Sequence, residues 1–148
     1  MCSVTLRPFT DADLDAVARV WLESWRSTGL DVVARATEGG NRARIRDELA
    51  VGWRVTVAVA DKRIVAFLAT KPATSALDQL FVSPDMKGRG IGTALLKRAM
   101  ADMPGGLWLR TADANVDACR FYEAHGLRRD RVELHPRLGH ATAIYLWP

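Results

Sequence analysis

Three glycines that alternate with other residues mark the stretch of this sequence best suited to bind a ligand. Gly88, Gly90 and Gly92 follow an apolar run that ends at Pro84, and a helical pattern begins at Ile91. A glycine-rich turn that leads into a helix leaves backbone N–H groups without partners, and the positive end of the helix dipole lies behind them. The spacing therefore predicts an anion site, most naturally for a phosphate. An ordinary strand-to-helix turn with flexible glycines is the simpler interpretation, and it stays open at this point.

Two well-known phosphate-binding patterns do not fit these glycines. The nucleotide P-loop requires G-x-x-x-x-G-K-[ST], and no lysine followed by serine or threonine stands at that spacing here. The dinucleotide fingerprint requires G-x-G-x-x-G on the first strand–helix turn, whereas this chain has G-x-G-x-G at residues 88–92. These two patterns therefore do not identify the ligand.

A second group of residues shares one face of a later helix. Asn115, Ala118, Cys119 and Tyr122 fall at i, i+3, i+4 and i+7, which places the Tyr122 hydroxyl two turns from Asn115. From the residues alone, Tyr122 could also be a buried tyrosine whose hydroxyl bonds to the backbone. Cys119 reads as a small core residue.

The periodicity of apolar residues predicts the elements that position these groups. Thr10 to Asp13 fits a capping box, and a helix then carries Trp21 and Trp25 on its apolar stripe. Gly126 stands where a left-handed residue ends a helix, and Asp113 is a plausible cap for the same helix. In chain order we expect a strand over 3–9, a helix to residue 25, a connection over 27–40, a basic helix over 41–50, a hairpin of strands over 53–60 and 64–70, a strand over 76–82, a helix to about 103, a strand over 107–111, a helix over 115–125 and strands over 128–134 and 141–147.

Several side chains allow two interpretations. Trp21 and Trp25 suit a core or a pocket wall, and the less favoured reading has Trp25 lining an acceptor pocket. The cluster of Arg42, Arg44 and Arg46 suits a solvated face, and guidance of an acidic substrate is the less favoured reading. The three histidines, His125, His135 and His140, are expected to face solvent.

Length and composition limit the class of protein. The 148 residues favour a single domain over 1–148, with 49% hydrophobic and 26% charged residues as in globular proteins. No apolar run is long enough for a membrane span, and the N-terminus lacks a signal peptide pattern, so a cytoplasmic location is expected. Cys2 and Cys119 suit neither a disulfide framework nor zinc, and we expect no metal. The net charge of +4 suits a polyanionic ligand but is too modest and scattered to indicate nucleic acid.

Lys87 to Gly92 resembles the acetyl-CoA-binding signature [Q/R]-x-x-G-x-[G/A] of the GNAT superfamily of N-acetyltransferases. Lys87 departs from the usual first residue: it keeps the charge but replaces a planar fork with a flexible ammonium. Asn115 to Leu127 resembles a second family segment, N-x-x-A-x-x-[FL]-Y-x-x-x-G-[FL], and the order of elements is that of the family. The resemblance implies an α/β (α+β) fold, with a mixed, mostly antiparallel sheet of about seven strands, flanked by about four helices and splayed at the acetyl-CoA site.

The same resemblance implies transfer of an acetyl group from acetyl-CoA to a primary amine of a small molecule or amino acid by direct attack in a ternary complex. Pantetheine would lie along the strand before the glycine turn, and Tyr122 would protonate the thiolate, since pKa values near 10 and 8.5 suit a shared proton. The cofactor-binding residues would be Leu80, Phe81, Val82, Lys87, Gly88, Arg89, Gly90, Ile91, Gly92, Thr93 and Asn115, with Thr93 adding a hydroxyl donor.

The base and the acceptor are less well defined. Asp78 is the carboxylate on the strand before the glycine turn, and two-residue alternation places it on the same side of that strand as Leu80 and Val82. A water chain is the alternative base, and an ordinary surface or turn carboxylate is at least as good an interpretation of Asp78. Acetylation of a macromolecular amine (a protein N-terminus, a lysine or an aminoacyl-tRNA) and a non-catalytic acyl-CoA-binding module are alternatives. The family often forms homodimers, but no feature of this chain demonstrates one.

Overall fold

The computed structural model describes residues 3–30 and 36–148. Within them, seven strands form one sheet in the order β1-β2-β3-β4-β5-β7-β6, and all neighbours are antiparallel except the parallel pair β4–β5. The strands are β1 (Val4–Pro8), β2 (Arg54–Ala60), β3 (Arg63–Lys71), β4 (Ala76–Val82), β5 (Leu107–Ala112), β6 (Arg128–Leu134) and β7 (Ala141–Trp147). The helices are α1 (Leu14–Arg26), α2 (Glu38–Ala50), α3 (Ile91–Asp102) and α4 (Val116–Ala124), with short 3-10 turns η1 (Asp11–Asp13), η3 (Pro72–Thr74) and η4 (Pro84–Met86).

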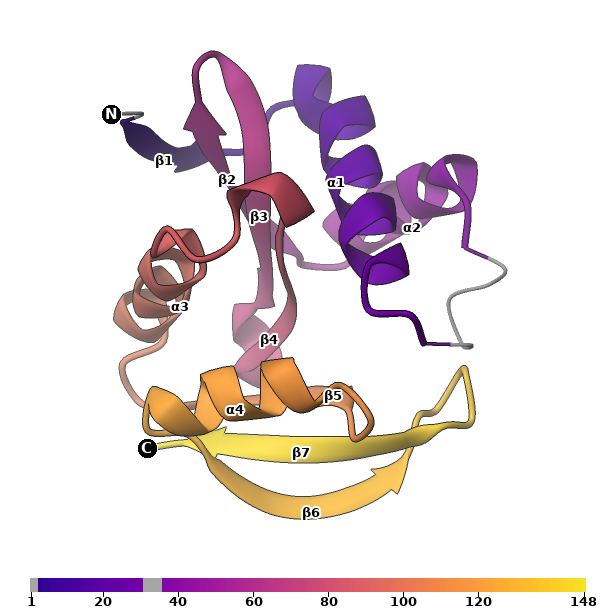
Figure 1. Ribbon diagram of the computed structural model, residues 1–148, viewed down its shortest axis with the longest axis vertical. Helices are drawn as coiled ribbons and strands as arrows, with labels where there is room; N and C mark the ends of the chain where they lie inside the picture. The colour runs from indigo at the N-terminus through magenta and orange to yellow at the C-terminus, as the bar shows by residue number, and fades with distance from the viewer. Residues whose placement is uncertain (1–2, 31–35) are drawn as a thin grey trace.

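This architecture confirms the predicted fold class, a mixed and mostly antiparallel sheet flanked by helices (Figure 1). Helices α1 and α2 cover one face through a cluster that includes Val17, Trp21 and Ile45. Helices α3 and α4 cover the other face through a larger cluster that includes Leu95 and Tyr122. No helix in the described part of the chain is long and apolar enough to cross a membrane.

The start of one helix and the cap of another differ from the prediction. Helix α2 begins at Glu38 rather than Asn41, because the Thr37 side chain caps it by accepting a 2.9 Å hydrogen bond from the Gly40 N–H. The rest of the predicted connection includes residues 31–35, which lie outside the described residues.

The predicted cap of α4 is also wrong. Asn115, not Asp113, caps the helix, since its Oδ1 accepts from the Ala118 N–H at 3.2 Å. Asp113 instead accepts from Arg129 Nη1 at 2.8 Å. The end of the helix is as expected, because Gly126 has a left-handed φ of 86°.

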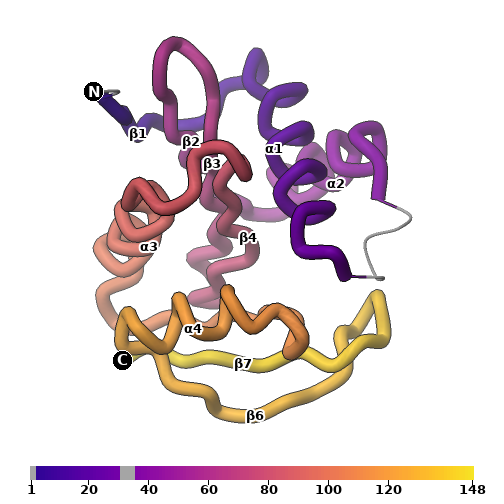
Figure 2. The backbone as a smooth tube through the Cα atoms, in the orientation of Figure 1, coloured from indigo at the N-terminus to yellow at the C-terminus, as the bar shows by residue number. Residues whose placement is uncertain are grey.

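The sheet splits between β4 and β5. These two strands pair only at Ala76 and Trp108, where the Trp108 N–H also donates to the Ser75 carbonyl at 3.0 Å. Beyond that point they diverge, and β2–β4 run up and down the view while β6 and β7 run across it (Figures 1 and 2). A β-bulge lies in β4 at Asp78, since Ala69 pairs with Gln79 while Thr70 pairs with Leu77.

Candidate functional site

The split opens into a cleft of about 1210 Å³. Its wall is formed by β4, the glycine turn, the first turn of α3, one face of α4, the end of α1 and the loop between β6 and β7. This volume exceeds the range of about 300–1,000 Å³ that is usual for one small ligand. The cleft therefore has room for an extended ligand and a second, smaller molecule.

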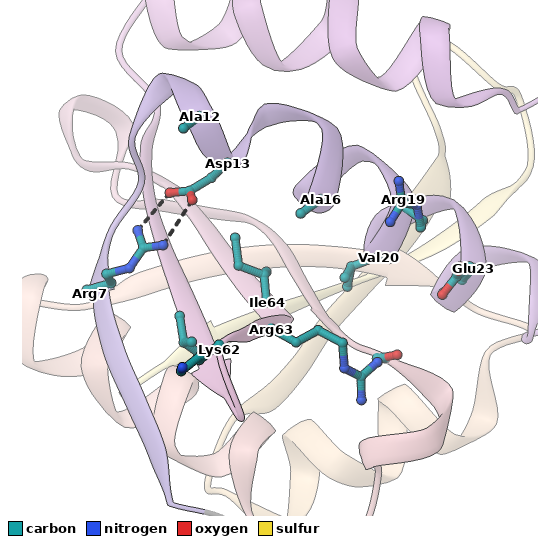
Figure 3. Close-up of a pocket in the computed structure, with 12 residues that line it drawn as sticks. Arg7, Ala12, Asp13, Ala16, Arg19, Val20, Glu23, Lys62, Arg63 and Ile64 are labelled. Carbon is teal, nitrogen blue, oxygen red and sulfur yellow. Dashed lines mark hydrogen bonds and ion pairs between the residues drawn. The ribbon is translucent and has the colours of Figure 1, made fainter.

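A smaller hollow of about 390 Å³ lies between α1 and the β2–β3 hairpin. Figure 3 shows Arg7 and Asp13 pointing toward each other there, joined by hydrogen bonds of 2.7 and 2.9 Å from the guanidinium to the carboxylate. The Arg7 guanidinium lowers the pKa of Asp13 to about 2. Arg63 is likewise paired, with Asp85 at 2.9 Å. Because these charges satisfy one another, the larger cleft is the better candidate for a ligand site.

The turn before α3 presents free backbone donors to this cleft. Gly88 and Gly90 have left-handed φ values of 77° and 80°, which only glycine adopts without strain. Gly90 caps α3 without a side chain, and the first helical hydrogen bond runs from the Ala94 N–H to the Gly90 carbonyl at 3.0 Å. The N–H groups of residues 91–93 therefore have no acceptor in the helix, as an anion site requires.

The residues predicted to bind a cofactor meet in this cleft with one exception. Arg89 is exposed and does not line it, whereas Lys87 is exposed at its wall. The predicted residues that line the cleft are Leu80, Phe81, Val82, Lys87, Gly88, Gly90, Ile91, Gly92, Thr93 and Asn115.

The Thr93 hydroxyl, predicted as a free donor, already has a partner. It lies 3.0 Å from His125 Nε2, while His125 Nδ1 lies 2.8 Å from the Phe121 carbonyl oxygen. A carbonyl can only accept, so Nδ1 carries a proton, and in the neutral ring Nε2 accepts the Thr93 proton. His125 is half-buried against the Phe121 ring, at 4.5 Å between centroids, so the prediction that it faces solvent is wrong.

Tyr122 lines the cleft from α4, and its side chain is buried. Its hydroxyl has no hydrogen-bond partner among the described residues, so the alternative of a hydroxyl bonded to the backbone is not what the structure shows. Burial, with a smaller contribution from Cys119, raises the pKa of Tyr122 well above its usual value. The match of ordinary pKa values expected from the sequence therefore does not hold, and the hydroxyl of Tyr122 keeps its proton at neutral pH. Cys119 itself is buried in the core and does not line the cleft.

Asp78 lines the cleft but faces the opposite side of the sheet from that predicted. Its Oδ2 accepts a 2.7 Å hydrogen bond from Trp53 Nε1, and Trp53 belongs to the cluster under α1 and α2. Leu80 and Val82 pack against the cluster on the other face. The β-bulge at Asp78 adds one residue to the strand, and this reverses the alternation on which the prediction rested.

Two tryptophans of α1 form part of the wall. Trp25 is half-buried and stacks on Trp21 with ring centroids 6.3 Å apart, and both rings line the cleft. Trp21 Nε1 is buried without an acceptor among the described residues. A molecule bound at this end of the cleft would therefore meet an aromatic wall.

The loop between β6 and β7 adds two residues that sequence reasoning missed. His135 and His140 are half-buried, line the cleft and stack with centroids 5.1 Å apart, so the expectation that they face solvent is wrong. Burial lowers the pKa of both rings. His135 Nδ1 accepts from the backbone N–H groups of Arg137 and Leu138, both at 3.0 Å, which leaves its proton on Nε2.

Basic side chains also gather at this end of the cleft. They come from α2, the end of β3, β5 and the same loop, and are Arg44, Lys71, Arg110 and Arg137. No motif links these positions in the sequence. Only Arg44 belongs to a recognisable pattern, the cluster of three arginines on the predicted basic helix. Among the described residues, no group of three or more His, Cys, Asp or Glu side chains is arranged to hold a metal ion.

Comparison with known proteins agrees with the fold and the two motifs. Residues 14–127 match the model of the acetyltransferase (GNAT) family. A peptidyl-lysine N-acetyltransferase, YjaB of Salmonella typhimurium, is 36% identical over 52 residues, which is 35% of this chain and 35% of that relative. The matched stretch thus spans about a third of that relative's length.

Solved structures share the fold over almost the whole chain. A GCN5-related N-acetyltransferase from Rhodopseudomonas palustris superposes with a TM-score of 0.78 at 20% identity, covering 99% of this chain and 96% of that one. The yncA structure from Salmonella typhimurium, solved with its cofactor acetyl-CoA, gives a TM-score of 0.75 at 14% identity, covering 97% and 92%. With the family match extending over residues 14–127, the chain belongs to the GNAT family of acetyltransferases.

Proposed function

We propose that this protein transfers an acetyl group from acetyl-CoA to a primary amine of a small molecule or amino acid. One observation carries the proposal: the free N–H groups at the start of α3 and the side chain of Tyr122 belong to the wall of one cleft, where β4 loses its neighbour in the sheet. The relative solved with acetyl-CoA shares this fold, which supports the choice of donor.

The donor's pyrophosphate suits the turn between Gly88 and Thr93. The N–H groups of residues 91–93 and the helix dipole would hold its negative charge, and the left-handed Gly90 lets the backbone approach closely. The amide-rich pantetheine suits the open edge of β4 over Leu80 to Val82, where an extended ligand adds as a strand would. Ser24 already donates to the Val82 carbonyl at 2.9 Å, so the ligand would pair with the other open groups.

The reaction needs no covalent intermediate on the protein. The amine nitrogen attacks the thioester carbonyl carbon, the new C–N bond forms as the C–S bond breaks, and the amine loses one proton. Tyr122 would donate to the departing thiolate, which a buried and protonated phenol can stabilise. Asp78 is the candidate to receive the amine proton, directly or through water, because it is the carboxylate on the cleft wall beside β4.

The test is release of CoA thiol from acetyl-CoA across a panel of amines. We expect release with at least one small primary amine, together with mass addition of one acetyl group. Absence of release with every amine, despite saturable acetyl-CoA binding, would favour the non-catalytic binding module.

A second candidate is acetylation of protein lysines, since YjaB of Salmonella typhimurium is named a peptidyl-lysine N-acetyltransferase. Its similarity covers only 35% of this chain, so it ranks second. A lysine-containing peptide in the same panel separates the two, because it should react faster than any free amino acid if this candidate is right. A cytoplasmic location and a homodimer stay predictions.

A further inference from the structure

The end of the cleft near the start of β4 carries more positive than negative side chains. Its described wall includes Arg44, Lys71, Arg110 and Arg137, while the carboxylate on the wall there is Asp78. The charges of three of these arginines, Arg44, Arg110 and Arg137, act on His135, so all three lie near this ring. Four separate elements thus converge on a basic pocket beside the candidate base.

The protein compensates these charges only in part. Glu48 is shared between Arg44, at 3.7 Å, and Lys71, at 3.8 Å, and Arg110 lies 3.7 Å from Glu133. Arg137 has no carboxylate partner among the described residues.

Arg44 is the member of this group with a buried hydrogen-bond donor that has no acceptor in the described part of the chain. Its Nε–H is buried without an acceptor among the described residues, although a buried donor normally has one. Burial lowers the pKa of Arg44, and repulsion from Arg137 adds to that effect. Two guanidinium groups that repel each other at a cleft wall would both gain from an anion between them.

A negative group stands beside this pair. Asp78 is close enough to Arg44 for its charge to act on the guanidinium, and its Oδ2 is fixed by Trp53. The pocket therefore places a site for a cation next to a site for an anion. A molecule with an ammonium and a carboxylate a few bonds apart matches both.

We propose that the acceptor is an amino acid or a similar small molecule, whose carboxylate is bound by Arg44 and Arg137 while its amine lies at Asp78. Arginine suits this role because its planar fork can donate two parallel hydrogen bonds to one carboxylate. This proposal rests on the proposed function for the reaction, but it makes a separate claim about which molecules bind.

The experiment compares each of the common amino acids with its own α-carboxamide. The two share a side chain and differ in the negative charge. The amide has the less basic amine, so more of it is neutral and ready to attack at pH 7.5. Faster reaction of the acid therefore cannot come from amine reactivity. Thiol release gives kcat/KM, and calorimetry on CoA-saturated protein gives binding without turnover.

We expect the preferred acid to exceed its amide at least tenfold in kcat/KM. Arg137→Gln and Arg44→Gln should each lower kcat/KM for the acid about 10- to 100-fold, chiefly through KM, and lower it much less for the amide, so that the acid loses its advantage. Arg46→Gln is the matched control, since Arg46 is exposed on the same helix and does not line the cleft. Arg137 is exposed on its loop, so its variant tests the idea even if Arg44→Gln folds poorly.

The outcomes separate the two proposals. Acids that bind CoA-saturated protein better than their amides, but release no thiol, would overturn the transferase function and keep the anion pocket. Equal rates for acids and amides, or an acid preference that survives Arg137→Gln, would overturn the anion pocket and keep the transferase. Faster reaction of acidic peptides than of any free amino acid, or no binding by any acid, would also overturn it.

Discussion

Tyr122 holds its proton more firmly than an exposed tyrosine because burial disfavours the phenolate. We expect Tyr122→Phe to lower kcat about 100-fold or more and to leave the dissociation constant of acetyl-CoA within about twofold. The raised pKa also predicts no loss of rate from this group up to about pH 10, because it stays protonated there. Initial rates of thiol release across pH, with calorimetry for binding, measure both.

Tyr145→Phe is the matched control for this substitution. The Tyr145 hydroxyl bonds to Glu123 and Arg129, and its ring is buried beside that of Tyr122 without lining the cleft. This variant should lose stability and keep its turnover per folded molecule. Full turnover by Tyr122→Phe would remove Tyr122 from the mechanism.

Asp78 can be tested without disturbing its neighbours. Asp78→Asn removes the negative charge but keeps an oxygen that accepts from Trp53, now 2.7 Å away, so the fold should persist. We expect kcat/KM to fall about 100-fold, within the usual range for an acid–base group, while acetyl-CoA affinity is retained. Asp102→Asn, at the far end of α3, controls for loss of one charge. A wild-type rate would leave water as the base.

At the scale of elements, the structure explains why two glycines of the turn differ. Gly90 has a left-handed φ, whereas Gly92 lies in the first turn of α3 with a Phe121 atom 3.5 Å from where a Cβ would stand. This is an ordinary contact, and it agrees with a signature that requires glycine at the first position and accepts alanine at the second. We expect Gly90→Ala to lower the free energy of unfolding by about 1 kcal/mol and acetyl-CoA affinity about tenfold. Gly92→Ala should keep its stability. Chemical denaturation and calorimetry would show the difference, and equal losses in the two variants would contradict it.

The start of α1 carries a pH-dependent contribution to stability. Asp13 accepts from the Thr10 N–H at 2.8 Å and from Arg7, and its pKa falls from 3.8 to about 2 on folding. The unfolded chain therefore binds this proton more readily, so the stabilisation is complete above pH 3.8 and is lost as pH falls toward 2. We expect Asp13→Asn to cost about 1–2 kcal/mol at pH 7 and much less near pH 2.

Urea denaturation at both pH values measures this effect. Asp11→Asn, in the same 3-10 turn but without the Arg7 contact, is the control and should change little at either pH. A loss that is equal at pH 7 and pH 2 would contradict the assignment.

Most elements could be predicted because local pattern determines them. The apolar stripe of α1 and the strict alternation of β2 leave little choice, and both appear as expected. The start of α2 was harder to predict, because Gly39 and Gly40 are typical of a loop. In the structure they belong to the first turn of the helix, which the Thr37 side chain caps. The facing of Asp78 depends on its pairing with β3, and a bulge cannot be seen in one strand alone.

At the scale of the whole molecule, ligand binding should stabilise the split sheet. Acetyl-CoA at 100 times its dissociation constant should add about 2.7 kcal/mol to the free energy of unfolding. For a chain of this size that corresponds to a rise in melting temperature of about 5–10 °C. Thermal denaturation followed with and without acetyl-CoA measures it, with Gly90→Ala as a weakened binder. No shift at millimolar acetyl-CoA would contradict the proposed donor site.

The two ends of the cleft differed in how well the sequence predicted them. The end of the cleft near the start of α3 is made of contiguous motifs, so most of its residues could be predicted, including Gly88, Gly90, Gly92 and Tyr122. The basic end joins Arg44 to Arg137, and folding alone brings such distant positions together. No spacing rule connects these arginines in the sequence. The role proposed for them also depends on Asp78 of β4, which lies near Arg44 only in the folded protein.

The open edge of β4 has a consequence for self-association. Beyond Ala76 this strand has no neighbour on one side among the described residues, and exposed strand edges are templates on which other chains can pair. Ser24 occupies only one of the carbonyls, that of Val82. A ligand that pairs with this edge would also shield it, so we expect the protein without acetyl-CoA to be the form more prone to edge-to-edge aggregation. The donor would then act as a solubilising partner as well as a substrate.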